Sequence, residues 1–399
     1  MTDAGPRTTR QDRSEDAVAR SIEDAATGAL AGSAVGDALG GAAEGNPPAV
    51  IQERYGGTIE GIVPPFHADW RTARPIAPYH KGDGHVTDDT LMTGLLVDVY
   101  AEVRRHLTAH DVAEHLVPRM IREVRWIPEL EAEALPLQRV FLAEKWLVAR
   151  LHYGHVDPRE AGVGNVVNCG ATMYVAPIGL VNAGDPAGAY AEAIDVAGAH
   201  QSSYGREAAG VFAAAVAAAA APDATVASVV DASLALAKDG TRAAIEAVVE
   251  AASSLDGWRG DGLAALRDAV RPFDTVGDHY RQPAMDARLP SRTKAIEELP
   301  IAFGMLVACG GDYREAVLGA VNYGRDSDSI AVMAGAVAGA LGGEAAVPAE
   351  WIDEVGAASR LDLRAPGGVV AAVAREVLAS DEARLAARRS VAERLGIAA

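Results

Sequence analysis

Apolar residues recur every three or four positions along most of the chain, which is the spacing that places them on one face of an α-helix. The pattern starts after residue 20, where Ile22, Ala25, Ala29 and Leu30 form the first apolar stripe. Runs that alternate between apolar and polar residues, as half-buried strands do, are few and short. The sequence therefore predicts an all-α protein built around one large helical domain.

The periodic segments continue to the end of the chain with one long interruption. Residues 45–86 are rich in Pro, Gly and His and show no period, so we expect a long loop region, which in compact domains is often functional. The other helices are expected at Thr90–Val103, Val112–Val124, Leu137–Leu151, Ala187–Ala199, Arg206–Ala220, Val226–Lys238, Thr241–Ser254, Gly262–Ala269, Lys294–Cys309, Tyr313–Val321 and Ser329–Leu341, with about three more in residues 348–399.

Small residues shape the expected interior. Gly32, Gly36 and Gly40 lie four positions apart in the first helical segment, which leaves one helix face without side chains. Gly contributes 41 residues and aromatic residues only 5% of the chain. An interior of this kind suits helices packed at short distances.

No fixed-period repeat and no low-complexity linker divides the chain. We expect a flexible N-terminal arm over residues 1–20, a catalytic domain over 21–345 and C-terminal helices over 346–399 packed on that same domain.

The formal net charge of -19 limits the kinds of partner. A surface this acidic repels nucleic acid and anionic membranes, and the sequence has no Lys/Arg block long enough to reverse that locally. We therefore expect neither as a partner, and an anionic substrate would have to be met by local positive groups or by bound cations.

The expected location is the cytoplasm. Two cysteines, Cys169 and Cys309, are too few for a disulfide framework or a cysteine-type zinc site. The polar start of the chain has no apolar core of the signal-peptide type. The most apolar stretch, Ala208–Ala221, is dominated by Ala and indicates a buried helix, not a membrane span.

An early acidic motif, defined here as Thr87, Asp88 and Asp89, stands where the long loop ends and a helix begins. Thr87 is a good N-cap, and acids in the first turn suit the helix dipole. Two adjacent carboxylates nevertheless repel each other unless a cation lies between them. The motif therefore fits both a helix cap and a cation site.

A late acidic motif, defined here as Asp326, Asp328 and Ser329, also stands at the start of an apolar helix. Helix capping is again one interpretation. The two motifs together offer four carboxylates and two hydroxyls, an all-oxygen set that suits hard cations such as magnesium, manganese or calcium and does not favour zinc. Two ions explain this number of ligands better than one.

The pairing of Thr-Asp-Asp-Thr at 87–90 with Asp-x-Asp-Ser at 326–329 resembles the ADP-ribosylglycohydrolase family. The likeness extends over roughly residues 25–345, and several separate blocks match in order, which is more specific than one short pattern. The further blocks are the glycine-rich helix Gly28–Glu44, the middle loop Asn168–Leu180, the segment at Ala199 and His200, and the helical run Glu298–Asn322.

The resemblance implies an all-α fold with a binuclear magnesium centre, with manganese as an alternative ion. It implies that the metal ligands are Thr87, Asp88, Asp89, Asp326, Asp328 and Ser329. It also places Glu44 beside the reactive ribose, and the catalytic candidates are Glu44, Asp326 and Asp89. The substrate-contact candidates are Asn168, Gly170, Ala171 and Met173 on the middle loop, together with Tyr174, His200 and Arg325.

The chain departs from the family pattern at three places. Arg325 stands where Gly is usual, and it could block close approach of a ligand or supply a clamp for phosphate or carboxylate. Tyr174 stands where a basic residue commonly follows the methionine, and it could stack on a base or fill space. Ser327 and Ser329 replace threonines but keep a hydroxyl. These differences bear on the substrate more than on the metal centre.

Three functions fit these observations. The first is a metal-dependent hydrolase that removes ADP-ribose from a protein or another acceptor. The second is a small-molecule ribosylhydrolase acting on a nucleoside- or nucleotide-derived metabolite, which Arg325 and Tyr174 favour. The third is a protein that binds ADP-ribose without turnover, and the complete set of acidic ligands argues against it. Cleavage of a ribosyl bond develops positive charge on the sugar, which nearby carboxylates can stabilise.

Overall fold

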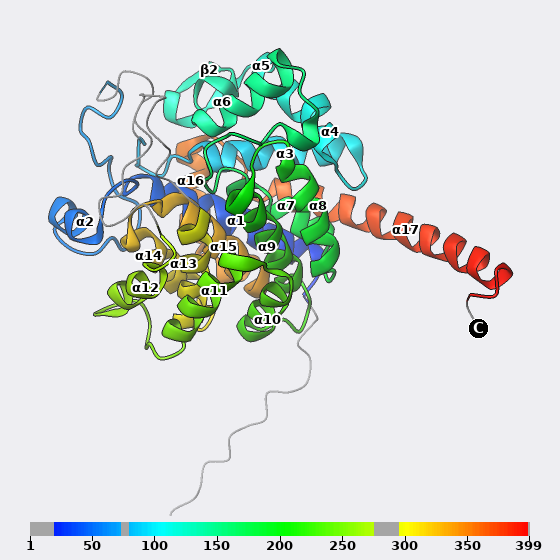
Figure 1. The fold of residues 1–399 in the computed structure, drawn as a ribbon. Helices are drawn as coiled ribbons and strands as arrows, with labels where there is room; N and C mark the ends of the chain where they lie inside the picture. Colours follow the sequence, from blue (N-terminus) through cyan, green and yellow to red (C-terminus); the bar gives the residue numbers. More distant parts are fainter. Residues whose placement is uncertain (1–19, 73–79, 275–294, 398–399) are drawn as a thin grey trace, which may run out of the picture.

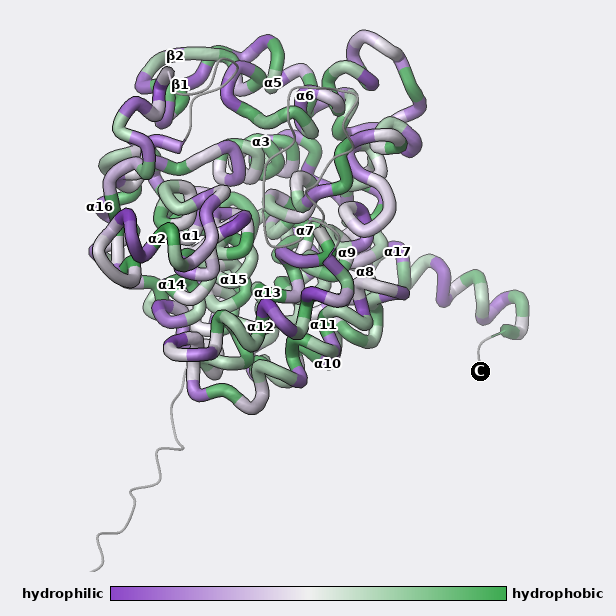
Figure 2. Tube along the Cα trace, turned by 60° about the vertical axis from the view of Figure 1, so that its left-hand side comes forward, coloured by the Kyte–Doolittle hydropathy of each residue, from purple (hydrophilic) through white to green (hydrophobic). Residues whose placement is uncertain are grey.

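The computed structural model describes residues 20–72, 80–274 and 295–397. Within these ranges the protein is all-α, with one two-stranded sheet as its only sheet, as the periodicity predicts (Figure 1). The expected N-terminal arm, apart from Arg20, lies outside the described residues. The hydrophobic colours gather on the central helices, and the hydrophilic colours on the loops around them (Figure 2).

The α-helices are α1 (Ile22–Gly41), α2 (Pro48–Tyr55), α3 (Asp88–Val103), α4 (Ala109–Asp111), α5 (Val117–Arg122), α6 (Leu142–Val148), α7 (Ala176–Val181), α8 (Pro186–Gly198), α9 (Ser203–Ala219), α10 (Val226–Leu236), α11 (Asp239–Ala252), α12 (Gly262–Val270), α13 (Ala295–Ala308), α14 (Tyr313–Tyr323), α15 (Ser327–Gly342), α16 (Ala349–Ser359) and α17 (Ala365–Arg394). The strands β1 (Arg125–Ile127) and β2 (Ala132–Ala134) pair antiparallel.

Three sequence expectations about the elements are wrong. The loop region 45–86 contains α2, which the pattern hides because Ile51 is its only buried residue. The two helices expected over 112–124 and 137–151 are shorter, and each is joined to a π-helical turn, at Val112–Leu116 and Ala149–Tyr153. The C-terminal region holds two α-helices and not three, because α17 runs unbroken for 30 residues.

Helices α1 and α15 pack at very short distance in the centre of the protein (Figure 1). A Cβ atom added to Gly32 would lie 2.7 Å from the carbonyl oxygen of Gly335, and one added to Gly36 would collide with the carbonyl of Ala331. The glycine face that the sequence predicts is therefore the contact surface with α15. This packing brings the end of α1 against the start of α15, where Ser327 Oγ donates to the Gly40 carbonyl at 2.8 Å.

A buried carboxylate joins α1 to the start of α3. Asp37 Oδ2 accepts hydrogen bonds from the backbone N–H groups of Thr87 at 2.9 Å and Thr90 at 3.1 Å, and also from the Thr90 hydroxyl. Burial, only partly offset by these hydrogen bonds, raises the pKa of Asp37 to about 6. Asp37 thus fixes the early motif beside the end of α1.

Helix α17 packs on the protein through its first half and projects from it in its second half (Figure 1). Its buried residues end at Val377. Near that point His106 bridges two carboxylates, with Nδ1 2.5 Å from Glu192 Oε2 on α8 and Nε2 3.0 Å from Asp381 Oδ2 on α17. The imidazole therefore ties α17 to α8.

The His106 bridge predicts a stability change at alkaline pH. Hydrogen bonds to Glu192 and Asp381 outweigh burial and raise the pKa of His106 to about 9, above the ordinary value of 6.5. A group whose pKa is raised by folding stabilises the folded protein while it is protonated. This stabilisation is complete at a pH below the pKa of the unfolded state, and it is lost as the pH rises through the pKa of the folded state. We expect the free-energy advantage of the wild type over His106→Gln in urea unfolding to disappear between pH 7 and pH 10. A constant difference across that range would contradict the bridge.

Candidate metal centre

The early motif caps α3, and its carboxylates lie inside the protein. Thr87 is the N-cap, and its hydroxyl accepts from the Asp89 N–H at 3.3 Å. Asp88 and Asp89 occupy the first turn and are 6% and 3% exposed. Capping explains Thr87, but it does not explain two buried acids side by side, because an exposed acid would serve the helix dipole as well.

The late motif lies directly against the early one. Asp326 is the N-cap of α15, and Asp328 Oδ1 accepts from the Ser329 N–H at 3.0 Å. The Ser329 hydroxyl donates to Asp89 Oδ1 at 3.0 Å, which joins residues 240 positions apart. The structure therefore brings together the two motifs that the sequence singles out.

The two motifs form a buried anionic cluster. Burial and the nearby Asp37, Asp88 and Asp326 hold the pKa of Asp89 well above its ordinary range. Burial and Glu44 raise the pKa of Asp326 to about 6. The pKa of Asp328 is also well above its usual range, first through burial and then through Glu44. Carboxylates held this close in low dielectric need a compensating positive charge, and this donor set of carboxylates and hydroxyls fits a hard divalent cation.

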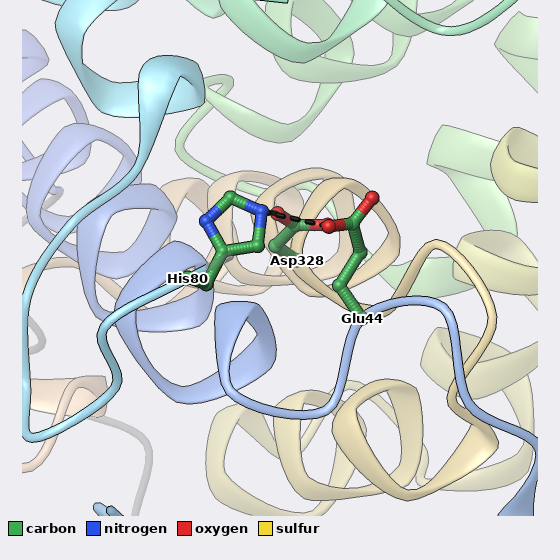
Figure 3. Close-up of side chains that lie close together, drawn as sticks. All are labelled: Glu44, His80 and Asp328. Carbon is green, nitrogen blue, oxygen red and sulfur yellow. Dashed lines mark ion pairs between the residues drawn. The ribbon is translucent and has the colours of Figure 1, made fainter. Parts of the chain in front are cut away.

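Glu44 and His80 extend the cluster on one side (Figure 3). Glu44 follows α1 in a turn, and His80 lies on the loop that leads to α3. The His80 Nε2 atom is 2.7 Å from Glu44 Oε2 and 3.4 Å from Asp328 Oδ2. These three side chains point toward one another, and their ligand atoms lie close enough together to share one ion. Sequence reasoning identified Glu44 through the family resemblance, and it missed His80 because His80 lies in the aperiodic segment.

The segment between α5 and α6 supports this side of the cluster. Glu129 Oε1 lies 3.0 Å from His80 Nδ1 and accepts from the Lys81 N–H at 2.8 Å. Arg139 pairs with Glu129 and lies 3.6 Å from Asp88 Oδ1. Burial favours the neutral acid, but Arg139 and His80 outweigh it and lower the pKa of Glu129 to about 2. No spacing pattern in the sequence indicates Glu129 or Arg139 as residues of the site.

Two further residues, Cys169 and Glu298, lie close to Asp326. The Cys169 thiol donates to Asp326 Oδ2 at 3.2 Å, and Glu298 on α13 completes a buried group of possible ligands with them. Burial and the charges of Asp326 and Glu297 hold the pKa of Glu298 well above its usual range. The family resemblance covers the helix that contains Glu298, but the sequence does not indicate Glu298 as a site residue, since a lone acid in a helical pattern is not distinctive.

The middle loop reaches the cluster through Cys169, but its expected ligand-facing groups bond within the protein. Asn168 Oδ1 accepts from the Gly170 N–H at 3.1 Å and from Gln201 Nε2 at 2.8 Å. Ala171 and Met173 are buried. Gly170 is required by space, because a Cβ atom there would lie 2.6 Å from a Glu144 carboxylate oxygen.

Tyr174 and His200 lie together in the interior. Both side chains are completely buried, their rings stack with centroids 5.8 Å apart, and the Tyr174 hydroxyl lies 3.1 Å from His200 Nδ1. The other ring nitrogen of His200 is 3.3 Å from a carboxylate oxygen of Glu144. In this arrangement Tyr174 fills space in the interior, and the base of a nucleotide cannot stack on its ring.

Arg325 is also directed into the protein. Its guanidinium lies 2.6 Å from Glu297 Oε1 and 3.3 Å from Asp274 Oδ2, and the residue is 3% exposed. Its backbone has φ 59°, in the left-handed region that glycine adopts without strain, which accounts for the glycine usual at this position. Its backbone N–H and carbonyl pair with Asn46 and Gly45, which holds the turn carrying Glu44 beside the late motif.

None of the helices in the described ranges is long and apolar enough to span a membrane. The expected lack of nucleic-acid and membrane partners remains a prediction.

Three comparisons relate this chain to known proteins. The family model for ADP-ribosylglycohydrolase matches residues 19–389. An uncharacterized protein of Archaeoglobus fulgidus is 27% identical over 332 residues, covering 83% of this chain and 92% of that protein. A solved structure titled as an ADP-ribosylglycohydrolase-related protein complex shares the fold at a TM-score of 0.53 and 20% identity, covering 89% of this chain and 99% of that one. This chain belongs to the ADP-ribosylglycohydrolase family.

Proposed function

We propose that this protein is a divalent-metal-dependent hydrolase that cleaves a ribosyl glycosidic bond and releases ADP-ribose from an acceptor. The observation that carries the proposal is the hydrogen bond between Ser329 and Asp89, which places the carboxylates of two distant motifs in one buried cluster. Family membership supports the glycosidic class of the reaction.

The residues proposed to hold the cations are those of the two motifs, Thr87, Asp88, Asp89, Asp326, Asp328 and Ser329. Their oxygen donors fit two magnesium ions, with manganese as the alternative. When bound, the ions would hold the ribose hydroxyls and orient a water molecule.

Carboxylates of the chain would perform the acid–base part of the reaction. Cleavage at the ribosyl carbon develops positive charge on the sugar ring, and an anionic site stabilises that charge. Glu44 and Asp326 are the candidates for accepting the proton of the attacking water, because both carboxylates lie in the buried cluster close to Asp328. Asp89 would contribute charge stabilisation.

The positions of Arg325 and Tyr174 favour the acceptor-directed activity over the small-molecule alternative. That alternative relied on these two residues as new substrate contacts. Arg325 pairs with Glu297, and Tyr174 stacks on His200, so both side chains are engaged inside the protein and not with a substrate. We assign them a positioning role, and we propose that the middle loop around Asn168 and Gly170 lies nearest to the substrate.

The activity can be tested with purified protein, magnesium and a panel of ADP-ribosylated proteins, small ADP-ribose conjugates and nucleotides. We expect release of free ADP-ribose from at least one acceptor, loss of that release in excess EDTA and its return on adding magnesium or manganese. Release from small conjugates alone would favour the small-molecule activity. Calorimetric binding of ADP-ribose with no product from any conjugate would indicate a binding protein instead, and activity undiminished by the chelator would contradict metal dependence.

A further inference from the structure

In the described part of the chain, the His80 ring lies between the carboxylates of Glu44 and Asp328 on one edge and the carboxylate of Glu129 on the other. Its Nε2 atom faces Glu44 and Asp328, and its Nδ1 atom faces Glu129. The ring is 9% exposed, so these contacts and not solvent decide its orientation. The residue comes from a loop with no helical period, so packing alone does not require a histidine here.

The separations around Nε2 match those of ligands that share one ion. Two adjacent ligands of an octahedral cation with bonds of 2.0–2.1 Å lie about 2.9 Å apart. The distances from Nε2 to Glu44 Oε2 and to Asp328 Oδ2 are 2.7 Å and 3.4 Å, on either side of that value. The three ligand atoms all lie within 4.8 Å of one another.

The other ring nitrogen of His80, Nδ1, has the kind of partner that a metal-binding histidine usually has. Such a residue almost always donates its other ring N–H to a carboxylate or carbonyl, which fixes the tautomer and turns the free nitrogen toward the ion. Glu129 Oε1, 3.0 Å from Nδ1, is placed to accept that N–H. Glu129 is itself held by Arg139 and by the Lys81 N–H.

Arg139 Nη2 also lies 2.7 Å from His80 Nδ1. At this distance the guanidinium donates to an unprotonated Nδ1, and the ring proton is then on Nε2. A metal on Nε2 requires the other tautomer, in which Nδ1–H and Arg139 both donate to Glu129, which already lies beside both groups. Arg139 thereby keeps Glu129 ionised beside the ring, and an ionised carboxylate is the stronger acceptor for the histidine N–H.

We propose that His80 is a metal ligand through Nε2, oriented by Glu129, and that it completes one cation position together with Glu44 and Asp328. This inference rests on the proposed metal-dependent function and deepens it. Magnesium takes oxygen ligands, whereas imidazole suits transition ions. The position containing His80 therefore disfavours magnesium and favours a transition ion; manganese is the transition ion that also suits the oxygen ligands Glu44 and Asp328. The remaining carboxylates form the oxygen-only position.

The test is pulsed EPR of the full chain loaded with Mn²⁺. A nitrogen bound directly to the ion gives ¹⁴N modulation in the spectrum, and we expect this modulation in the wild type and its replacement by a ¹⁵N signal after labelling with ¹⁵N-histidine. His80→Gln is expected to abolish it. His85→Gln is the matched control, because His85 is a buried histidine of the same loop that bonds to the Gly82 carbonyl and not to the acidic cluster; the signal should survive there.

Calorimetry supplies a second readout. We expect His80→Gln to weaken Mn²⁺ binding by about 100-fold with a smaller effect on Mg²⁺, and Glu129→Gln to weaken Mn²⁺ binding about 10- to 100-fold while keeping the nitrogen signal.

Bound Mn²⁺ without nitrogen modulation in the wild type, or modulation that persists in His80→Gln, would overturn the role of His80 and leave the proposed hydrolase intact. Failure of the wild type to bind either ion would overturn both. The wild-type spectrum decides the question even if a substituted protein does not fold.

Discussion

The Asp89→Asn protein is expected to lose at least about 1000-fold in kcat/KM while its metal-free form becomes more stable than the wild type. The activity falls because a carboxylate proposed to bind metal becomes a neutral amide, and the loss of a few kcal/mol of transition-state stabilisation corresponds to that factor. The stability rises because Asp89 is buried beside Asp37, Asp88 and Asp326. Removing one of several buried like charges should raise the free energy of unfolding by at least about 1 kcal/mol.

The substitution is conservative in shape, since an amide oxygen can still accept the hydrogen bond from Ser329. Asp98→Asn on the same helix is the matched control, because Asp98 pairs with Arg125 near the surface, where ion pairs contribute little. It should leave both kcat/KM and stability nearly unchanged. Chemical unfolding with and without magnesium gives the decisive comparison. Magnesium at 100 times its Kd should stabilise the wild type by about 2.7 kcal/mol and Asp89→Asn by clearly less. Equal gains in both proteins would refute the role of Asp89.

The Gly40→Ala protein is expected to be destabilised by about 3 kcal/mol and to bind divalent cations poorly. A Cβ atom at Gly40 would lie 2.5 Å from Asp328 Cα and from Ser327 O, both backbone atoms that cannot turn aside. The first turn of α15 must therefore move away from α1. Because that turn carries Asp328, a single added methyl group should disturb the metal ligands.

Gly94→Ala is the control for the helix effect itself. Gly94 lies inside α3 with nothing within 4 Å of an added Cβ, so alanine should stabilise the protein by up to about 1 kcal/mol through helix propensity. Urea unfolding and magnesium calorimetry on both variants separate the two effects. A stable Gly40→Ala protein with wild-type metal affinity would show that the close contact between α1 and α15 does not position the site.

Periodicity predicts the helices that bury a broad apolar face and fails where local contacts decide. Helices α8, α9, α11 and α14 begin and end within a few residues of their expected limits, because apolar residues recur through their full length. The helix α2 has a single buried residue, and the π-helical turns near α5 and α6 insert one extra residue into the hydrogen-bonding pattern. Neither feature leaves a period in the sequence.

Some residues of the candidate site could be predicted from the sequence, and others could not. Both acidic motifs could be predicted because each combines several chemically unusual residues at a loop-to-helix junction. His80, Glu129, Arg139 and Glu298 could not, since each is a single polar residue in its own segment, and only the folded chain places them beside the motifs. The sequence singles out Arg325 as a departure from the family pattern, but it gives no sign of the pairing with Glu297 on α13.

Crystals of the protein soaked in Mn²⁺ and measured at the manganese absorption edge test the central claim, that the two acidic motifs jointly bind divalent cations. We expect anomalous density in contact with carboxylates of both motifs, with Asp88 or Asp89 on one side of an ion and Asp326 or Asp328 on the other. Density bound to one motif alone, or none between them at saturating Mn²⁺, would contradict it.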